Sequence, residues 1–332
     1  MPTIAQDLDL TAINTIRTLA MDAVQAANSG HPGTPMALAP VSYQLWTQHL
    51  RYDPTRPHWP NRDRYVLSCG HASMLLYSLI HLAGIRQVDK NEKVTNEPAV
   101  SLEDIRQFRQ WGSRTPGHPE HGHTTGVETT TGPLGQGCGN SVGMAIAGRW
   151  LATRYNKPGF TLFDYNIWTQ CSDGDLMEGL SCEAASLAGH LKLSNLCWIY
   201  DDNHITIEGK TELAFSEDVA TRFRGLGWHV LAVQDANDLA AINHAYQGFL
   251  SYKEGPTLII VKSIIGYGAP TKAGTAKAHG EPLGDDEIAK TKAAYGWPAD
   301  AKFLVPPEVP RHFDATLGKR GKESREAWEK LW

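Results

Sequence analysis

Strand-like apolar runs alternate with helix-like segments along most of this chain. Residues 64–85, "RYVLSCGHASMLLYSLIHLAGI", show the repeating unit clearly: an apolar run, a tight turn and a buried helix that Gly84 closes. Similar units occupy residues 128–155, 160–193, 196–209 and 228–266. This alternation predicts an α/β fold with a mainly parallel sheet covered by helices on both faces. Ligands of such sheets bind beyond the carboxyl ends of the strands.

The two ends of the chain differ from this pattern. Residues 3–28 have apolar positions at helical spacing and run into "NSGHPGTP", where glycine and proline end a helix. After Gly284, Pro306, Pro307 and Pro310 predict an extended connector, and the last dozen residues read as the first turns of a helix. We therefore place a first domain at residues 1–284 and a connector leading into a helix at residues 285–332.

Charge and cysteine usage exclude several classes of function. Lys and Arg number 31 against 36 Asp and Glu, and the resulting net charge of −5 does not favour binding to a nucleic-acid backbone. Five cysteines without a CxxC pair favour neither a disulfide framework nor a zinc ribbon, and they fit a reducing compartment. The first residues lack a secretory signal, and no apolar stretch is long enough to span a bilayer. We expect a cytoplasmic protein that binds neither nucleic acid nor membrane.

The segment "CSDGDLMEG", residues 171–179, places acids and glycines where a strand ends and a helix begins. There the Asp173 carboxylate can hold a hard divalent cation, and Gly174 lets the backbone approach an anion at the helix start. An isolated Asp-Gly pair more often caps a helix. However, Asn203 follows the next strand, and adjacent parallel strands end side by side. Asp173 and Asn203 can therefore share one Mg²⁺ ion.

These residues resemble the thiamine diphosphate signature, a GDG triplet followed one helix and one strand later by an asparagine. The closest form is that of the transketolase family. The likeness continues in "SGHPGTPM", "DRYVLSCGHASMLLYSLIHL", "TPGHPE", "GVETTTGPLGQG" and "KAGTAKAHGEPLG", in the family's order along nearly the whole chain. It implies a thiamine diphosphate-binding fold that also takes Mg²⁺ or another divalent cation such as Ca²⁺. Residues 1–284 would be its diphosphate-binding domain.

The resemblance assigns roles to the matching positions. Those matching metal ligands are Asp173, Asn203 and the backbone carbonyl of Ile205. Those matching contacts to the cofactor are His71, Gly132, Pro133, Leu134, Gly174, Asn203 and His279.

Four histidines lie in loops with glycine or proline rather than on predicted core faces: His31, His71, His118 and His279. An imidazole can donate to a phosphate or sugar hydroxyl and exchange protons near neutral pH. By resemblance, His71 and His279 approach the diphosphate, while His31, His118 and His279 face the donor sugar. We therefore predict all four as catalytic residues.

The cluster "HPEHGH" also allows a zinc site made of His118, His121 and His123, although no HExxH helix is present.

Three acidic or substituted positions near the signature carry their own expectations. Ser172 stands where the first glycine of the triplet is usual, which the fold tolerates only if no positive φ is needed there. Glu178 and Glu183 are expected on the following helix, where its dipole favours acids. In the family, such acids lie near the contact between subunits.

The resemblance implies the N-terminal part of a transketolase, an enzyme of the pentose phosphate pathway that moves a two-carbon ketol unit from a ketose phosphate to an aldose phosphate. A transketolase continues into a pyrimidine-binding domain and a C-terminal domain, and this chain has neither. We therefore expect a pyrimidine-domain polypeptide as partner, within a homo- or hetero-oligomer. The alternatives are a related enzyme such as dihydroxyacetone synthase or a deoxyxylulose-phosphate synthase, a noncatalytic cofactor- or partner-binding module, and a zinc hydrolase built on "HPEHGH".

Overall fold

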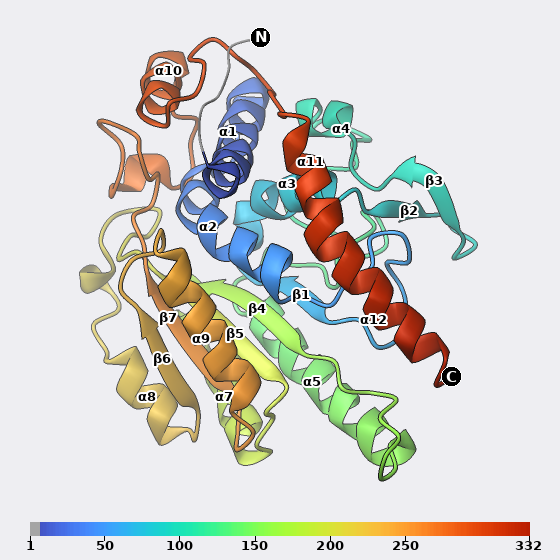
Figure 1. Cartoon of the computed structure of the whole chain (residues 1–332). Helices are drawn as coiled ribbons and strands as arrows, with labels where there is room; N and C mark the ends of the chain where they lie inside the picture. The colour runs from blue at the N-terminus through green and yellow to red at the C-terminus, as the bar shows by residue number, and fades with distance from the viewer. Residues whose placement is uncertain (1–6) are drawn as a thin grey trace.

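The computed structural model describes residues 7–332, which form a parallel sheet between two layers of helices (Figure 1). Within these residues the sheet has five strands in the order β1-β4-β5-β7-β6, and every neighbouring pair is parallel. The strands are β1 (Arg64–Leu67), β4 (Ile167–Ser172), β5 (Leu196–Asp202), β6 (His229–Val233) and β7 (Thr257–Lys262). A separate antiparallel ribbon consists of β2 (Arg86–Val88) and β3 (Val94–Pro98). The predicted α/β fold is confirmed.

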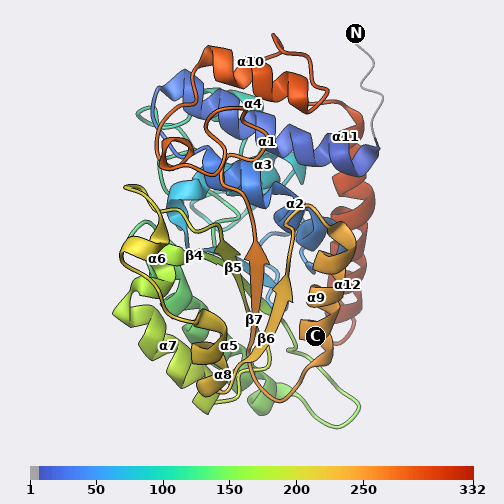
Figure 2. The same ribbon diagram turned by 90° about the vertical axis from the view of Figure 1, so that its left-hand side faces the viewer.

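The sheet is buried on both faces because side chains of one strand alternate between two apolar cores. In β5, Cys197 and Ile199 enter one core, while Trp198 and Tyr200 enter the other. The first core is covered by α1 (Leu8–Ala27), α2 (Gly33–Gln48), α3 (Ser73–Leu82) and α9 (Leu239–Ser251). The second is covered by α5 (Gln136–Tyr155), α7 (Gly179–His190) and α8 (Val219–Gly225). Figure 2 shows the sheet between these layers.

The helix α1 crosses above the carboxyl ends of the strands (Figure 2). It begins after Asp7, whose side chain accepts a hydrogen bond from the Asp9 N–H, and it ends at Asn28, which has a left-handed backbone. The expected start near residue 3 lies outside the described residues. Short helical turns complete this end of the molecule: Gly70–Ala72, α4 (Leu102–Arg106), α6 (Asp173–Met177), Thr211–Leu213 and Ala276–Ala278.

The region after residue 284 is more helical than its prolines suggest. It contains α10 (Asp285–Ala294), α11 (Glu308–Phe313), a π-helical turn (Asp314–Gly318) and α12 (Lys319–Glu329). The expected extended connector is wrong for residues 308–313. Pro310 lies in the first turn of α11, where a missing N–H breaks no helical bond, and Phe313 then packs into the first core. The division at residue 284 stays a prediction.

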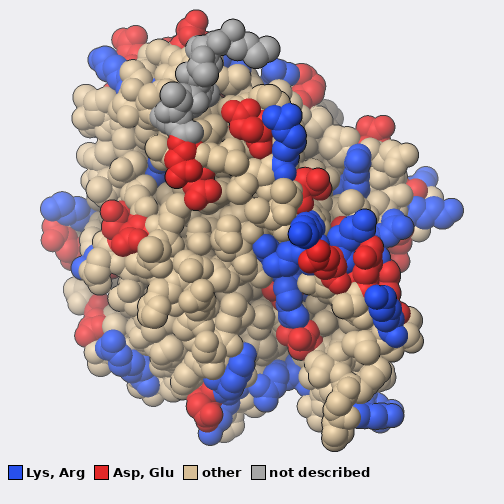
Figure 3. All heavy atoms as spheres, in the orientation of Figure 1, with Lys and Arg blue, Asp and Glu red and all other residues tan. Residues whose placement is uncertain are grey.

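Charged side chains gather along α12 on the face shown in Figure 3, whereas the area over α9 is poor in charge. Arg325 illustrates the mixture, because its guanidinium contacts Asp53, Glu326 and Glu329. Opposite charges are therefore interleaved on this face rather than gathered into a patch of one sign.

A buried ion pair fastens α10 to α1. Lys292 Nζ lies 2.5 Å from Asp22 Oδ1, and the two side chains are 1% and 3% exposed. The second carboxylate oxygen of Asp22 accepts the Phe303 N–H at 2.8 Å. Burial raises the pKa of Asp22, and the contact with Lys292 opposes that rise.

We expect Lys292→Met to lower the free energy of unfolding by about 3–5 kcal/mol, because it leaves the Asp22 carboxylate buried without its cation. Lys302→Met is the control: Lys302 and Asp285 are 71% and 76% exposed and 3.9 Å apart, so its loss should cost less than about 1 kcal/mol. Urea unfolding followed by circular dichroism measures both changes. Equal effects of the two variants would contradict the assigned role of the buried pair.

Candidate functional site

A cavity of about 330 Å³ lies at the carboxyl ends of β4 and β5, within the size range of small-molecule sites. Separate stretches of chain meet there, including the loop before α2, the turn before α3, the glycine loop before α5 and the loop after β5. Its lining consists of His31, Thr34, His71, His118, Gly132, Leu134, Ser172, Asp173, Gly174, Met177, Asn203, Ile205, Thr206, Ile207 and His279.

Of the residues proposed for catalysis, cofactor binding or the Mg²⁺ site, all but Pro133 line this cavity. Pro133 lies in the same glycine loop but is exposed to solvent. The sequence analysis gave no role to Thr34, Met177, Thr206 and Ile207, although Thr34 lies within the "SGHPGTPM" block. The cavity brings the proposed residues together, and their individual roles remain predictions.

The Asp173 carboxylate has one oxygen that is buried without a partner in the described part of the chain. Its side chain is buried, Oδ1 accepts a hydrogen bond from the Tyr200 hydroxyl, and Oδ2 has no partner among the described residues. Burial raises the pKa of Asp173 to about 7, with Asp201 and Asp202 adding to the rise and the Tyr200 hydroxyl opposing it. An unpaired buried carboxylate oxygen is costly, and a hard cation would satisfy it.

Asn203 lines the same cavity, and hydrogen bonds fix its orientation. Its Nδ2 donates to Asp201 Oδ2 at 2.7 Å, and its Oδ1 accepts the Ile205 N–H at 2.9 Å. Asp201 is fully buried and also accepts from the Ser263 hydroxyl. The sequence analysis singled out Asn203 but gave no role to Tyr200 or Asp201. Both hold the side chains of proposed ligands rather than facing the cavity themselves.

Three imidazoles form a compact group on another wall. The ring centroids of His71 and His279 are 5.1 Å apart in a stacked arrangement, and His31 meets them edge-on at 5.0 and 5.6 Å. Burial is the main reason that the pKa values of these rings and of His118 are lowered, to about 4 for His31. The four histidines are therefore neutral near pH 7. His71 Nε2 and His279 Nδ1 are buried without partners among residues 7–332.

Two glycines let these loops meet. A Cβ on Gly33 would lie 2.3 Å from the Ala278 carbonyl oxygen, and a Cβ on Gly70 would lie 2.5 Å from the Thr131 hydroxyl. A larger residue at position 33 would push apart the loops that carry His31 and His279. A larger residue at position 70 would separate His71 from the glycine loop.

A second buried carboxylate, Asp175, ties three of the lining segments together. It accepts hydrogen bonds from the Ser68 hydroxyl (2.7 Å), the Gly135 N–H (2.8 Å), and the N–H (2.9 Å) and hydroxyl (3.1 Å) of Ser172. Burial raises the pKa of Asp175, and these four donors oppose the rise. Asp175 belongs to the "CSDGDLMEG" segment, but the sequence alone indicates no function for it.

The positions around the signature differ in how they match expectation. Ser172 has φ −121°, an extended backbone open to any residue, so the condition set for a residue other than glycine at this position is met. Glu178 is not on a continuous helix with Asp173. Its ψ of 137° is extended, so α6 ends before it and α7 begins after it. Glu183 lies on α7 and is exposed, as is Glu178.

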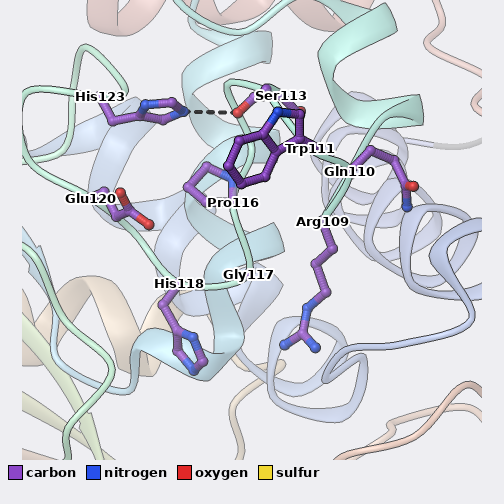
Figure 4. A pocket seen from close by; sticks show the side chains of 10 residues that line it. Arg109, Gln110, Trp111, Ser113, Pro116, Gly117, His118, Glu120 and His123 are labelled. Atoms are coloured by element: carbon purple, nitrogen blue, oxygen red, sulfur yellow. Dashed lines mark hydrogen bonds between the residues drawn. The ribbon is translucent and has the colours of Figure 1, made fainter.

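A neighbouring open cavity shares His118 with the first and is lined by Arg109, Trp111, Glu120 and His123 among others (Figure 4). The imidazoles proposed for zinc turn to backbone carbonyls instead: His123 Nε2 lies 2.8 Å from Ser113 O, and His121 Nδ1 lies 2.9 Å from Val127 O. Across residues 7–332, no three His, Cys, Asp or Glu side chains are grouped closely enough to hold a metal ion. The zinc alternative is wrong.

Comparison with known proteins gives a consistent result. Residues 8–332 match the family described as transketolase, thiamine diphosphate binding domain. The chain is 52% identical to a transketolase of Geobacillus stearothermophilus over 98% of its own length and 47% of the relative, and 48% identical to a transketolase of Bacillus subtilis over 97% and 46%. It therefore spans about half the length of the curated relatives it matches.

Solved structures agree with the sequence comparison. A crystal structure of a transketolase mutant from Pichia stipitis superposes with a TM-score of 0.92 at 43% identity, covering 98% of this chain and 46% of that one. Transketolase from Leishmania mexicana gives a TM-score of 0.91 at 42% identity with the same coverage.

We expect Asp175→Ala to lower the free energy of unfolding by about 3–5 kcal/mol, because two backbone N–H groups and two hydroxyls lose their acceptor in a buried place. Asp218→Ala is the control, since this exposed N-cap aspartate also accepts a backbone N–H, at 2.9 Å from Thr221, and should cost about 1 kcal/mol. Urea denaturation compares the two. A cost for Asp175→Ala no larger than the control would show that Asp175 does not organise the site.

Proposed function

The chain belongs to the transketolase thiamine diphosphate-binding domain family, and we propose that it forms the diphosphate- and Mg²⁺-binding half of a transketolase active site. The observation that carries this proposal is the unpaired, buried Oδ2 of Asp173, which faces the same cavity as Asn203, Ile205 and Gly174. A complete enzyme of this kind would transfer a two-carbon ketol unit from a ketose phosphate to an aldose phosphate.

The residues present fit thiamine diphosphate with a divalent cation. Asp173, the Asn203 amide oxygen and the Ile205 carbonyl would hold Mg²⁺, or Ca²⁺ in its place, with water and phosphate oxygens as further ligands. His71 Nε2 and His279 Nδ1 are buried polar atoms in need of partners, which supports contacts from these rings to the diphosphate. When bound, the cofactor would supply the stabilised carbanion that carbon–carbon cleavage requires.

The slim glycine loop would hold the rings of the cofactor. Gly132 and Leu134 line the cavity, and Pro133 fixes the backbone between them. A Cβ on Gly174 would lie 2.8 Å from a Leu134 methyl, so the signature turn and this loop are already in close contact.

The histidines would handle the protons and hydroxyls of the substrate. Because burial keeps His31, His118 and His279 neutral, each ring has one nitrogen that can donate and one that can accept. Such rings can bind sugar hydroxyls and move a proton between oxygen atoms without bringing a net charge into the cavity.

A pyrimidine-domain polypeptide would complete the site, as part of a homo- or hetero-oligomer. Exposed apolar side chains on α5, on α7 and directly after α7 support association: Trp150 is 61%, Leu180 43%, Leu187 45% and Leu191 42% exposed. The substrates would be sugar phosphates; one solved relative, from Pichia stipitis, is described as a complex with sedoheptulose 7-phosphate at 44% identity to this chain.

The five free thiols support a cytoplasmic location. Among the described residues, no helix combines the length and apolarity needed to cross a membrane.

A second candidate is a module that binds cofactor or a partner without turnover. A related enzyme such as dihydroxyacetone synthase would use the same cofactor site with another acceptor. Both candidates would keep the proposed Mg²⁺ site. The module would catalyse no reaction, and the related enzyme would transfer the ketol unit to a different acceptor.

We expect Asp173→Ala to weaken Mg²⁺-dependent binding of thiamine diphosphate by more than about 100-fold, since loss of an outer-shell partner alone costs about 10–100-fold. Asp202→Ala is the comparison, because Asp202 lies at the end of β5 and lines a neighbouring cavity that also contains Asp173, but does not line the proposed cofactor cavity. Isothermal titration with and without Mg²⁺ measures both variants. Binding that survives Asp173→Ala would refute the metal assignment.

The reaction itself is tested by adding xylulose 5-phosphate and ribose 5-phosphate to the chain with Mg²⁺ and thiamine diphosphate. The assay is run with and without a polypeptide that carries the pyrimidine-binding and C-terminal domains of a transketolase. We expect ketol transfer only in the mixture. Activity of this chain alone would contradict the need for a partner, and cofactor binding without activity in the mixture would favour the noncatalytic module.

A further inference from the structure

Arg109 has an unusual backbone beside the cavity. It follows α4 with φ +62°, a left-handed conformation that is uncommon for a residue other than glycine. The conformation is held by the buried Phe108 on one side and by a hydrogen bond from the Arg109 N–H to the Thr115 carbonyl at 3.0 Å on the other. Strained backbone of this kind persists where the surrounding structure demands a particular side-chain direction.

The side chain of Arg109 reaches from this loop toward His31. Its Nη1 donates to the Ser29 hydroxyl at 2.8 Å, and its Nη2 lies 3.5 Å from His31 Nδ1. The stem passes over Gly117, where a Cβ would lie 3.2 Å from Nε. Figure 4 shows the guanidinium extending to the same side as the His118 ring, away from Trp111.

We propose that Arg109 is a positioning residue that fixes His31 in the tautomer with its hydrogen on Nε2. A guanidinium has donors and no acceptor, so the imidazole nitrogen that faces it must present a lone pair. Ser29 anchors the guanidinium from the other end and keeps the donor aimed at Nδ1. The single ring hydrogen of neutral His31 therefore resides on Nε2.

The Nε2 edge of the His31 ring has no hydrogen-bond partner among the described residues. Nε2 and Cδ2 lie on the side of Gly280, 3.3 Å from the place of a Cβ there, and no described residue hydrogen-bonds to Nε2. Because His31 lines the cavity, an Nε2–H without a partner in the chain is available to a ligand oxygen. Arg109 thus presets one donor before any ligand enters.

The other titratable groups around His31 act in the same direction. His71 and His279 contact its ring, His118 lines the same cavity, and Arg109 carries a full positive charge. Burial, followed by His279, Arg109 and His118, lowers the pKa of His31 to about 4. No acid among these neighbours would favour a second proton, so the ring stays neutral with one tautomer selected.

The mechanistic value of this arrangement rests on the proposed function. A preset Nε2–H would meet a carbonyl or hydroxyl oxygen of the sugar without reorganisation at the moment of reaction. The tautomer itself is a property of the chain alone, so it can be tested whether or not the chain takes part in ketol transfer.

The test is long-range ¹H–¹⁵N NMR of the histidine rings in the ¹⁵N-labelled full chain, with His31 assigned by the signal lost in His31→Gln. We expect one neutral tautomer, protonated on Nε2, in the unchanged protein. Arg109→Met retains the stem but removes the donors and the charge. In this variant both tautomers should be populated, and the titration midpoint of His31 should rise from about 4 toward the ordinary value of about 6.5.

Further variants separate positioning from a general loss of structure. Arg109→Lys keeps the charge and should restore part of the Nε2–H preference. Ser29→Ala leaves Arg109 in place without its anchor and should populate some Nδ1–H form. Arg106→Met, which removes a neighbouring arginine paired with Glu103, should leave the His31 signals unchanged. An Nδ1–H tautomer in the unchanged protein, or the same single tautomer and midpoint in Arg109→Met and Ser29→Ala, would overturn the proposal.

Discussion

The cavity depends on one buried carboxylate that does not face it. Asp175 accepts hydrogen bonds from the end of β4, from the segment after β1 and from the glycine loop before α5. These segments are far apart in sequence, and their secondary-structure propensities alone would not bring them together. Leaving a buried acceptor without its donors costs more free energy than the hydrogen bonds contribute on balance. The three segments are therefore held in one fixed arrangement. The places of Asp173, His71 and Gly132 follow from this constraint.

The chemistry of the site is set by the exclusion of charge from its histidines. Three imidazoles with centroids 5.0 to 5.6 Å apart cannot all be protonated in a buried place, and Arg109 adds a further cation beside them. Neutral rings act through the direction of one donor and one acceptor each. The hydrogen bonds around each ring therefore matter more than its charge, and a group such as Ser29 can influence the cavity without lining it.

The sequence predicted what depends on neighbouring residues or on regular geometry. A strand, an Asp-Gly turn and a helix can be read from contiguous letters, and Asn203 could be paired with Asp173 because adjacent parallel strands end together. Contacts set by loop packing could not be predicted. Arg109 meets His31 across 78 residues and only through a left-handed backbone. Pro310 was expected to keep the chain extended, yet the first turn of a helix accepts it.

The unsatisfied atoms of the cavity are tolerated because other regions stabilise the fold. Asp173 Oδ2 and His71 Nε2 each carry the cost of burial without a partner, in a chain whose sheet is packed on both faces by separate apolar cores. The exposed leucines of α7 have the opposite character, since they add apolar surface to water without serving either core. Both features have the same physical explanation: each is unfavourable while it faces water or an empty cavity, and each would become favourable once covered. The proposed cofactor site and the proposed contact surface therefore rest on the same kind of observation, a local cost that the rest of the fold outweighs.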